Sequence, residues 1–467
     1  MNNFNADKYK SCIRDSDPVR YNGKVRQVIG LVIESHGPAA SVGEICLIER
    51  KNASPIKAEV VGFRENNVLL MPLGEMHGIC PDSNVISSGR PLTVKVGPRL
   101  LGRVVDALGV PIDGKGMIEA QTEVAIDNPP PPPMQRRRIS EPLSTGIRAI
   151  DGLLTCGKGQ RIGVFSGSGV GKSTTLGMIA RFTSADVNVV ALVGERGREV
   201  RDFVEKDLGE EGLSRSVVVV GTSDQPALIR MKTAFVATAI AEYFRDQEND
   251  VLLMMDSVTR FAMAQREVGL AVGEPPTTRG YTPSVFALLP KLLERSGTSS
   301  LGTITGLYTV LVEADDMNEP VADSIRAILD GHIVLSRDLA AQNHYPPIDV
   351  LNSISRLMID VVSNQHRESA GRLRDVLAAY RDSKDLVSIG AYVNGSNPRT
   401  DYALQIIDAV DNFLKQGISE SSSFQETAQR LISLTSPHEE RAVSLKQSQF
   451  PMAAPYRDIP EWMASTK

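Results

Sequence analysis

The order of apolar and polar positions divides the chain into three parts. Residues 25–93 consist of short β-type runs separated by Gly, Pro and Asn, a spacing that predicts a small barrel or sandwich. After Ser144, apolar strands alternate with helical stretches, which indicates a parallel sheet with crossover helices. From about Glu368 helices replace strands. The strands expected in the middle part are 161–166, 187–194, 216–221, 251–256, 308–314 and 331–336, and the helices expected there and beyond begin at Lys172 or span Ala227–Phe244, 371–382, 401–417 and 423–436.

A proline-rich stretch interrupts the middle part near its start. Five consecutive prolines, Pro129–Pro133, are followed by the basic cluster Arg136–Arg138. Consecutive prolines cannot donate to a sheet and favour extended polyproline geometry, so we interpret 128–138 as a connector, with a partner-binding motif as the alternative. The predicted divisions are an N-terminal segment 1–20, a β-barrel 21–95, an α/β domain 96–367, a helical domain 368–437 and a tail 438–467.

The tail, 438–467, differs in composition from the rest. It is polar, carries three prolines after Phe450 and contains the only tryptophan, Trp462. A disordered tail is the favoured interpretation, and a short docking peptide is the alternative.

Composition and charge restrict the class of protein. Hydrophobic residues make up 42% and charged residues 23%, the balance of a soluble globular protein, and the formal charge of −5 provides no global attraction to nucleic acid or anionic membrane. The four cysteines are widely spaced, which favours free thiols in a reducing compartment. The first residues lack the apolar core of a signal peptide, and no apolar run approaches the roughly 18 residues of a membrane span. We therefore expect a cytoplasmic protein.

One motif between a predicted strand and a predicted helix carries clear chemistry. Glycines in such a loop let consecutive backbone N–H groups point at phosphate oxygens, a lysine reaches the β and γ phosphates, and a serine hydroxyl ligates Mg²⁺. The strict P-loop pattern has glycine at position 166, where this chain has Ser166. That replacement is tolerable if φ is negative there. The predicted phosphate-binding residues are Gly167, Ser168, Gly169, Val170, Gly171, Lys172, Ser173 and Thr174, with Ser173 also a magnesium ligand.

Two acidic residues follow predicted strands, at the edge where open α/β sheets bind ligands. Asp256 ends an apolar strand, which suits a carboxylate that holds Mg²⁺ directly or through water, although a solvated strand-end carboxylate is the alternative. Glu195 ends another strand and is a candidate general base for an attacking water. From spacing alone, a salt-bridged turn is an equally good interpretation of Glu195.

Longer motifs carry a resemblance to a known family. The P-loop, GERGREVRDF (Gly194–Phe203), Met255–Gly297 and Ile328–Arg356 are similar to the rotary ATPase family, and more narrowly to the flagellum-specific ATPases of the type III export apparatus. The resemblance runs from about Val25 to about Gln416. It implies three domains: an N-terminal β-barrel, a central RecA-like P-loop ATPase domain with a parallel sheet, and a C-terminal α-helical domain. Its substrate would be ATP, with Mg²⁺ as cofactor.

The family also implies roles for single residues. By this resemblance Glu195 is the catalytic glutamate, Arg196 lies close to the γ-phosphate, and Lys172 neutralises phosphate charge. Tyr345 is similar to the tyrosine that stacks on adenine, although an aromatic beside two prolines is otherwise a turn-packing residue. Arg356 matches the arginine finger that enters the neighbouring subunit's site. Since one chain carries both Glu195 and Arg356, identical copies can complete each other's sites, and a homo-hexameric ring is the hypothesis.

Partners and location are likewise implied by the family. The expected partners are a regulator bound to the N-terminal segment 1–20, a stalk-like protein in the ring, the membrane proteins of the export gate, and complexes of export substrates with chaperones. The near-helical spacing of Tyr9, Cys12 and Ile13 is compatible with a docking helix, and a frayed terminus is the alternative. The expected location is cytoplasmic, peripheral at the membrane-embedded export apparatus.

Four alternatives remain open. An injectisome secretion ATPase is a close one, because the flagellar assignment rests partly on the GSGVGKS loop. The catalytic subunit of an ATP synthase shares the motifs. A hexameric nucleic-acid translocase shares the ATPase core, but the barrel region offers few aromatics for base stacking, so we expect no nucleic-acid partner. A non-catalytic ring subunit is disfavoured by Lys172 and Glu195 together.

Overall fold

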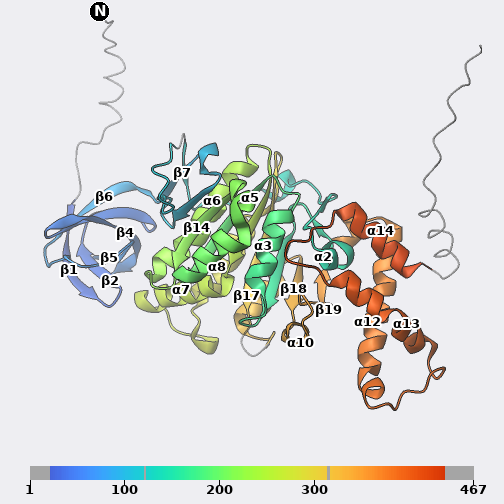
Figure 1. Cartoon of the computed structure of the whole chain (residues 1–467). Coiled ribbons are helices and arrows are strands. Elements are labelled where there is room, and N and C mark those ends of the chain that lie inside the picture. The colour runs from blue at the N-terminus through green and yellow to red at the C-terminus, as the bar shows by residue number, and fades with distance from the viewer. Residues whose placement is uncertain (1–21, 120–121, 313–315, 437–467) are drawn as a thin grey trace, which may run out of the picture.

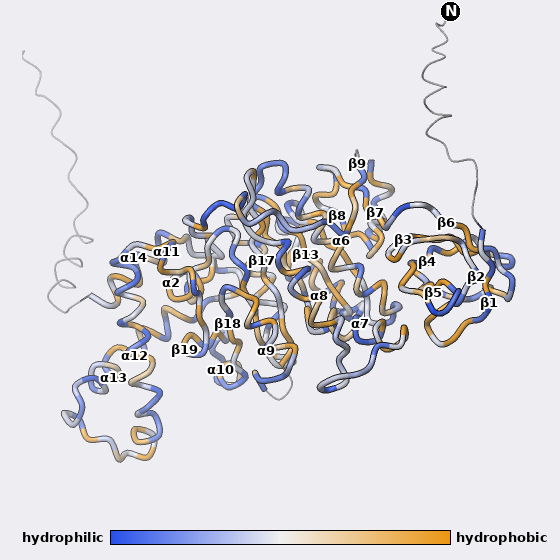
Figure 2. The backbone as a smooth tube through the Cα atoms, turned by 180° about the vertical axis from the view of Figure 1, so that it is seen from behind, coloured by the Kyte–Doolittle hydropathy of each residue, from blue (hydrophilic) through white to orange (hydrophobic). Residues whose placement is uncertain are grey.

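The computed structural model describes residues 22–119, 122–312 and 316–436, which form three parts in a row (Figure 1). A β-barrel lies at one end, an α/β domain in the middle, and helices α12–α14 at the other end. Seen from behind and coloured by hydropathy, all three parts contain hydrophobic segments (Figure 2). The predicted N-terminal docking segment and C-terminal tail lie outside the described residues.

The N-terminal part is a closed six-stranded barrel, as the sequence predicts. Its side chains alternate between inside and outside: in β3 (Glu44–Arg50), Cys46 and Ile48 are buried while Leu47 is exposed. Closure removes the unpaired edges that an open sheet would leave. The strands follow the order β1 (Asn22–Ile29), β2 (Val32–His36), β5 (Asn67–Pro72), β4 (Ala53–Arg64), β3 and β6 (Asn84–Pro91), and a separate pair is formed by β7 (Thr93–Val96) and β9 (Thr122–Ala125).

The central domain is built on a nine-stranded sheet. Seven of its strands are parallel, as expected for strands that alternate with helices. The main path runs β19 (Ile348–Ser355), β18 (Gly331–Leu335), β12 (Arg161–Ser166), β17 (Thr303–Leu311), β15 (Asp250–Asp256), β13 (Val187–Glu195), β14 (Ser216–Thr222) and β8 (Arg103–Asp106), and β16 (Gly297–Thr298) pairs with β17.

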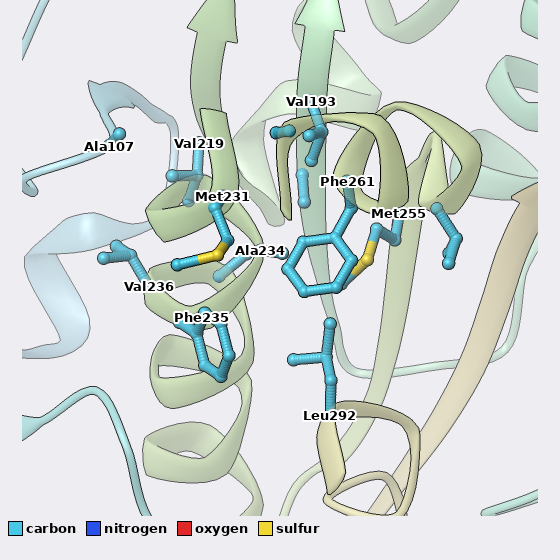
Figure 3. Packing of buried hydrophobic residues seen from close by; sticks show 14 of the residues in the cluster. Ala107, Val193, Val219, Met231, Ala234, Phe235, Val236, Met255, Phe261 and Leu292 are labelled. Carbon is cyan, nitrogen blue, oxygen red and sulfur yellow. The ribbon is translucent and has the colours of Figure 1, made fainter. Parts of the chain in front are cut away.

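Strand β13 shows why the central strands are continuously apolar. Val189, Ala191 and Val193 face one hydrophobic cluster, whereas Val190 and Leu192 face another on the opposite side of the sheet. A sheet covered on both faces needs apolar residues at every position. Figure 3 shows the first cluster from close by, where Val193 lies near Phe261 among the packed side chains of the helices on that face.

The helices divide between the two faces of the sheet. The first cluster includes residues of α6 (Ala227–Arg245), α7 (Val258–Val272), α8 (Pro283–Leu293) and α9 (Pro320–Ile328). The second includes residues of α2 (Arg148–Leu153), α3 (Lys172–Phe182) and the π-helix η3 (Phe203–Leu208), which connects α4 (Gly197–Asp202) to α5 (Gly209–Ser214). The predicted helix at 227–244 ends one residue later in the structure. The short remaining elements are η1 (Pro98–Leu100), η2 (Pro133–Gln135), β10 (Pro142–Leu143), β11 (Cys156–Gly157), η4 (Thr278–Gly280), α10 (Arg337–Ala341) and α11 (Met358–Val361).

One edge of the sheet departs from the parallel pattern. Strand β19 runs antiparallel to β18, and the sequence analysis did not predict it. The connection between them holds only the five-residue helix α10 and loops, too short for a crossover that would return the chain to the same end of the sheet. At the other edge, β8 adds a parallel strand from the segment that follows the barrel.

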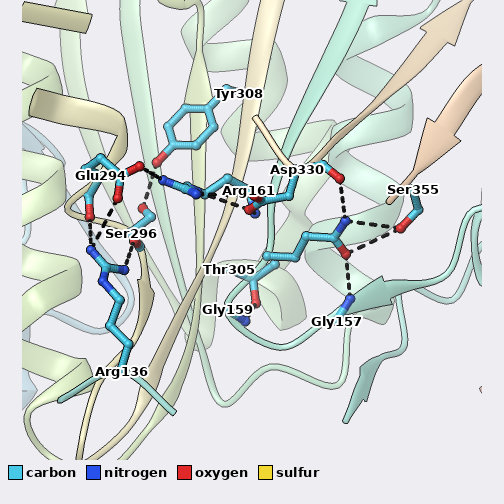
Figure 4. Close-up of polar contacts among 11 residues, drawn as sticks. Arg136, Gly157, Gly159, Arg161, Glu294, Ser296, Thr305, Tyr308, Asp330 and Ser355 are labelled. Atoms are coloured by element: carbon cyan, nitrogen blue, oxygen red, sulfur yellow. Dashed lines mark hydrogen bonds and ion pairs between the residues drawn. The ribbon is translucent and has the colours of Figure 1, made fainter. Parts of the chain in front are cut away.

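The proline-rich stretch is held against the central domain. Arg136 donates to the carbonyl oxygens of Glu294 (2.5 Å) and Ser296 (2.9 Å). Figure 4 shows this arginine beside Glu294, which also pairs with Arg161 at the start of β12. Arg161 in turn bonds Asp330 at 3.1 Å, so the stretch is tied to the edge of the sheet where β12 begins.

The C-terminal part consists of three helices, α12 (Asn364–Ser388), α13 (Pro398–Leu414) and α14 (Phe424–Thr435). Ser363 caps α12 by accepting from the N–H of His366, so this helix begins before residue 368. His366 Nε2 lies 2.8 Å from the carbonyl oxygen of Gly152, which docks α12 on α2. Among the described helices, none is long and apolar enough to cross a membrane.

Candidate nucleotide-binding site

The P-loop connects β12 to α3 as the sequence predicts. Gly169 (φ 79°) and Gly171 (φ 95°) adopt left-handed conformations, which glycine reaches without strain. Ser166 is the last residue of β12 and does not have positive φ, so its replacement of the usual glycine is compatible with the turn. Helix α3 begins at Lys172, and its first N–H groups face the loop, where they favour an anion.

Three charged side chains meet at the carboxyl edge of the sheet. Lys172 Nζ lies 2.5 Å from Asp256 Oδ1 and 3.8 Å from Glu195 Oε1. Asp256 also accepts a hydrogen bond of 2.7 Å from the Thr309 hydroxyl. The structure thus brings together Lys172 from the start of α3 with Glu195 and Asp256 from the ends of β13 and β15.

The environment of Glu195 suits a proton acceptor. Its side chain is buried, and burial is the main cause that raises its pKa to about 7. A hydrogen bond with Glu199 and the negative charge of Asp256 raise the pKa further, while Lys172 and Arg260 lower it. A carboxyl group that titrates near neutral pH is matched to general-base chemistry.

Lys172, Glu195 and residues of the P-loop line a cavity of about 830 Å³. Its lining carries six cationic side chains, Lys172, Arg196, Arg260, Arg266, Arg279 and Arg337, against three carboxylates, Glu195, Glu199 and Glu319. The excess of positive charge is appropriate for a polyphosphate ligand.

Arg260 is a residue of the site that the sequence analysis missed. Its guanidinium lies 3.4 Å from Glu195 Oε2 and donates to the carbonyl oxygen of Gly194. It stands on the first turn of α7, four residues after Asp256. A basic residue one turn beyond an acidic strand end was the available signal. Arg196 also lines the cavity, where it is largely exposed and lies 3.7 Å from Glu199.

Tyr345 lies beside the P-loop and is not among the residues that line this cavity. A Cβ atom built on Gly171 would be 3.6 Å from Tyr345 Cε1, so the ring lies next to this glycine. The side chain is 45% exposed, which leaves part of the ring free to stack on a ligand.

Arg356 does not join the other site residues. It directly follows β19, and its N–H donates to the carbonyl oxygen of Asp330, next to the start of β12. The P-loop follows the other end of β12, and a six-residue strand spans about 20 Å. Arg356 is exposed and lies away from the site of its own chain.

The donor set fits a magnesium ion only together with a nucleotide. Ser173 lines the cavity and offers a hydroxyl, and Asp256 offers a buried carboxylate. Among the described residues, no group of three or more His, Cys, Asp or Glu side chains could hold a metal. Mg²⁺ is commonly held by one or two protein oxygens plus substrate phosphates and water, and this pair matches that pattern.

Comparison with known sequences identifies all three parts. Residues 25–89 match the β-barrel domain of the ATP synthase alpha/beta family, and residues 146–355 match the nucleotide-binding domain of that family. Residues 362–433 match the T3SS EscN ATPase C-terminal domain. The chain is 58% identical over 430 residues to a flagellum-specific ATP synthase of Bacillus subtilis, covering 92% of this chain and 98% of the relative. It is 52% identical to a type 3 secretion system ATPase of Xanthomonas euvesicatoria, covering 89% and 94%.

Solved structures agree with the sequence matches. The assembled ATPase EscN from the type III secretion system of enteropathogenic E. coli superposes with a TM-score of 0.84 at 46% identity, covering 89% of this chain and 100% of that one. EscN in complex with its central stalk EscO gives a TM-score of 0.83 at 45% identity, with the same coverage. The resemblance and the three-domain fold predicted from the sequence are confirmed, and this chain belongs to the family of flagellum-specific and type III secretion ATPases.

Proposed function

We propose that this chain hydrolyses ATP as a homo-hexameric ring and thereby assists flagellar type III protein export. The observation that carries the proposal is the separation of two sets of charged groups. Lys172, Glu195 and Asp256 meet at one edge of the sheet, whereas Arg356 lies near the opposite edge. An arginine in that position is available to a neighbouring copy and not to its own site. The assembled state of EscN supports the ring.

In the proposed reaction, a water oxygen attacks the γ-phosphorus from the side opposite the β–γ bridging oxygen. The bond between the γ-phosphorus and that oxygen breaks, and ADP leaves. Glu195 accepts the proton of that water. Lys172, Arg196 and Arg260 stabilise the charge on the transferring group from within the chain, and Arg356 of a neighbouring copy does so from outside. Ser173 and Asp256 would hold a magnesium ion, which would supply further neutralisation of phosphate charge.

The base of the nucleotide is assigned to Tyr345. In this proposal the ring beside Gly171 stacks on adenine while the triphosphate occupies the loop from Gly167 to Thr174, which the closeness of Tyr345 to Gly171 supports. This arrangement accounts for the exposed part of an aromatic side chain that belongs to no hydrophobic cluster of the described residues.

The partners are proposed from relatives. The complex of EscN with EscO supports a stalk-like protein in the ring. We further propose a regulator on the N-terminal segment, and substrate–chaperone complexes delivered to the membrane proteins of the export gate. The location would then be peripheral to the export apparatus. Energy from hydrolysis would assist substrate unfolding, chaperone release and entry at the gate.

Phosphate release at several protein concentrations tests the hydrolytic ring. We expect specific activity to rise cooperatively with protein concentration and to vanish in Glu195→Gln, because each site needs residues of two copies. Specific activity that stays flat down to concentrations at which the chain is monomeric would contradict catalysis between subunits. Absence of activity in the wild type would indicate a nucleotide-binding scaffold.

Export is tested separately. In a flagellated strain that lacks its own export ATPase, expression of this chain should restore motility and secretion of filament protein, and Glu195→Gln should restore neither. Restoration of secretion only in an injectisome strain would favour the second candidate, a virulence-type secretion ATPase, which the EscN C-terminal domain match also allows.

A further inference from the structure

One buried glutamine connects three segments that are far apart in the sequence. Gln416 follows α13 and is 5% exposed. Its side-chain amide donates to the carbonyl oxygens of Gly146 and Glu420, both at 2.7 Å, and its Oε1 accepts from the N–H of Arg148 at 2.9 Å. Every polar atom of the amide group therefore has a partner. A fully bonded, buried side chain of this kind holds its own backbone in one position.

The backbone of Gln416 is in contact with Tyr345. The N–H of Gln416 donates to the carbonyl oxygen of Tyr345 at 2.9 Å. Within the part of the chain that the structure describes, this is the only hydrogen bond that Tyr345 makes. Since nearly half of the Tyr345 side chain is exposed, packing alone does not fix the ring. Backbone bonds from the N–H of His344 to Leu339 and from the N–H of Ile348 to Pro346 hold the neighbouring residues, and the bond from Gln416 is the one that acts on Tyr345 itself.

A second buried side chain fixes the segment around Gln416. Arg148, 2% exposed at the start of α2, donates to the carbonyl oxygens of Phe413 (2.7 Å) and Lys415 and pairs with Glu420. The end of α13 and the following loop are thus attached to the central domain immediately on both sides of Gln416. Motion of this loop relative to α2 would break several buried hydrogen bonds at once.

We propose that Gln416 is the positioning residue for Tyr345 and so sets the base-binding half of the nucleotide site, without touching the nucleotide. The proposal rests on the proposed stacking of Tyr345 on adenine. It assigns to the C-terminal helical part a direct role in nucleotide affinity, through the loop that follows α13. It also predicts that a change at Gln416 alters the affinity for ligands that carry a base and not for ligands without one.

The test compares two ligands on the full chain by titration calorimetry. One is adenylyl imidodiphosphate, a non-hydrolysable ATP analogue, and the other is inorganic tripolyphosphate, which has no base. In Gln416→Ala, the Kd of the analogue should rise by about three- to thirtyfold, because part of the binding energy from stacking of the base on the ring is lost. The Kd of tripolyphosphate should change by less than about twofold. In steady-state hydrolysis, KM for ATP should rise by a similar factor with a smaller change in kcat.

A matched control and a double-mutant cycle separate positioning from stability. His366→Ala removes another buried side chain that docks a C-terminal helix on α2, and it should leave both Kd values unchanged. In the Tyr345→Ala background, Gln416→Ala should have little further effect on the analogue, because the two residues act in series. If Gln416→Ala does not fold, Gln416→Asn keeps the amide but is one methylene too short to make all three bonds, and the same comparison applies.

The outcomes distinguish the proposals. Equal weakening of both ligands, or no weakening of either, overturns the positioning role. If Tyr345→Ala weakens the analogue and Gln416→Ala does not, the stacking role stands and the positioning role fails. If Tyr345→Ala itself has no effect, the proposed role of Tyr345 in nucleotide binding fails first.

Discussion

Lys172 Nζ and Asp256 Oδ1 lie 2.5 Å apart and form an ion pair. The lysine that would bind phosphate, which is partly buried, and the buried carboxylate that would hold magnesium therefore satisfy each other's charge. A nucleotide must draw the ammonium group toward its phosphates before the carboxylate becomes available to a metal.

This pairing predicts opposite effects of Asp256→Asn on two measurements. Without Asp256, Lys172 is free, so binding of ATP in the presence of EDTA should tighten by about fivefold to thirtyfold, the equivalent of a charged hydrogen bond of roughly 1–2 kcal/mol. Magnesium-dependent hydrolysis should be lost. Lys172→Met is the matched variant and should weaken ATP binding in EDTA. Weaker metal-free binding in Asp256→Asn would contradict the competition between the two partners.

The pH dependence of hydrolysis follows from the environment of Glu195. Its pKa is raised to about 7, so the ionised form that accepts a proton is lost as the pH falls through that value. We expect kcat/KM to fall on the acidic side with a midpoint near pH 7. Besides burial, the pKa is set by the four charged groups that face this carboxyl group, namely Lys172, Arg260, Asp256 and Glu199.

Glu199→Gln should move that acidic limb to lower pH. The Glu199 carboxylate accepts a hydrogen bond from protonated Glu195 and so stabilises the neutral form; glutamine is an uncharged and weaker acceptor, so the substitution lowers the pKa of Glu195. Glu205→Gln is the control, since Glu205 pairs with Arg201 in this region of the chain and has no part in the environment of Glu195. An acidic limb that does not move in Glu199→Gln would show that the two carboxyl groups are not linked.

Mixed rings test whether Arg356 acts between copies. Glu195→Gln should be inactive, and Arg356→Ala should lower kcat by about a thousandfold or more. When equal amounts of the two are dissociated and reassembled, about a quarter of the interfaces carry an intact glutamate and an intact arginine by random assortment, and activity should return to that extent. A mixture that regains no activity would exclude complementation between neighbours.

One buried ion pair joins α6, the residues after α8 and the residue after β9. Arg295 is 2% exposed, pairs with Glu242 through two bonds of 2.7 and 2.8 Å, and donates to the carbonyl oxygen of Ile126 at 2.6 Å. Arg295→Ala leaves Glu242 buried without its cation and should lower stability by about 3–5 kcal/mol. The exposed pair of Arg399 and Asp375 provides the control, where Arg399→Ala should change stability by less than about 1 kcal/mol. Urea unfolding followed by circular dichroism measures both.

Local patterns predicted the elements that carry the chemistry. The strand before the P-loop, the loop itself and the helix from Lys172 are contiguous, and their residue types are dictated by burial on both faces of the sheet and by backbone approach to phosphate. For the same reason, Glu195 and Asp256 at adjacent strand ends were predictable candidates, because the carboxyl ends of parallel strands meet at one edge. The separation of Arg356 from them was predictable only through the family resemblance.

The sequence by itself determined the three domains, the P-loop and the two acidic strand ends, since each depends on spacing within a short segment. Only the tertiary structure decided that Arg260 contacts Glu195, that β19 runs antiparallel at the edge of the sheet, and that Gln416 holds the backbone of Tyr345. These contacts join segments tens of residues apart, or depend on strand direction. Hydrophobic periodicity specifies which face of an element is buried, but the partner against which that face packs is set by the complete fold.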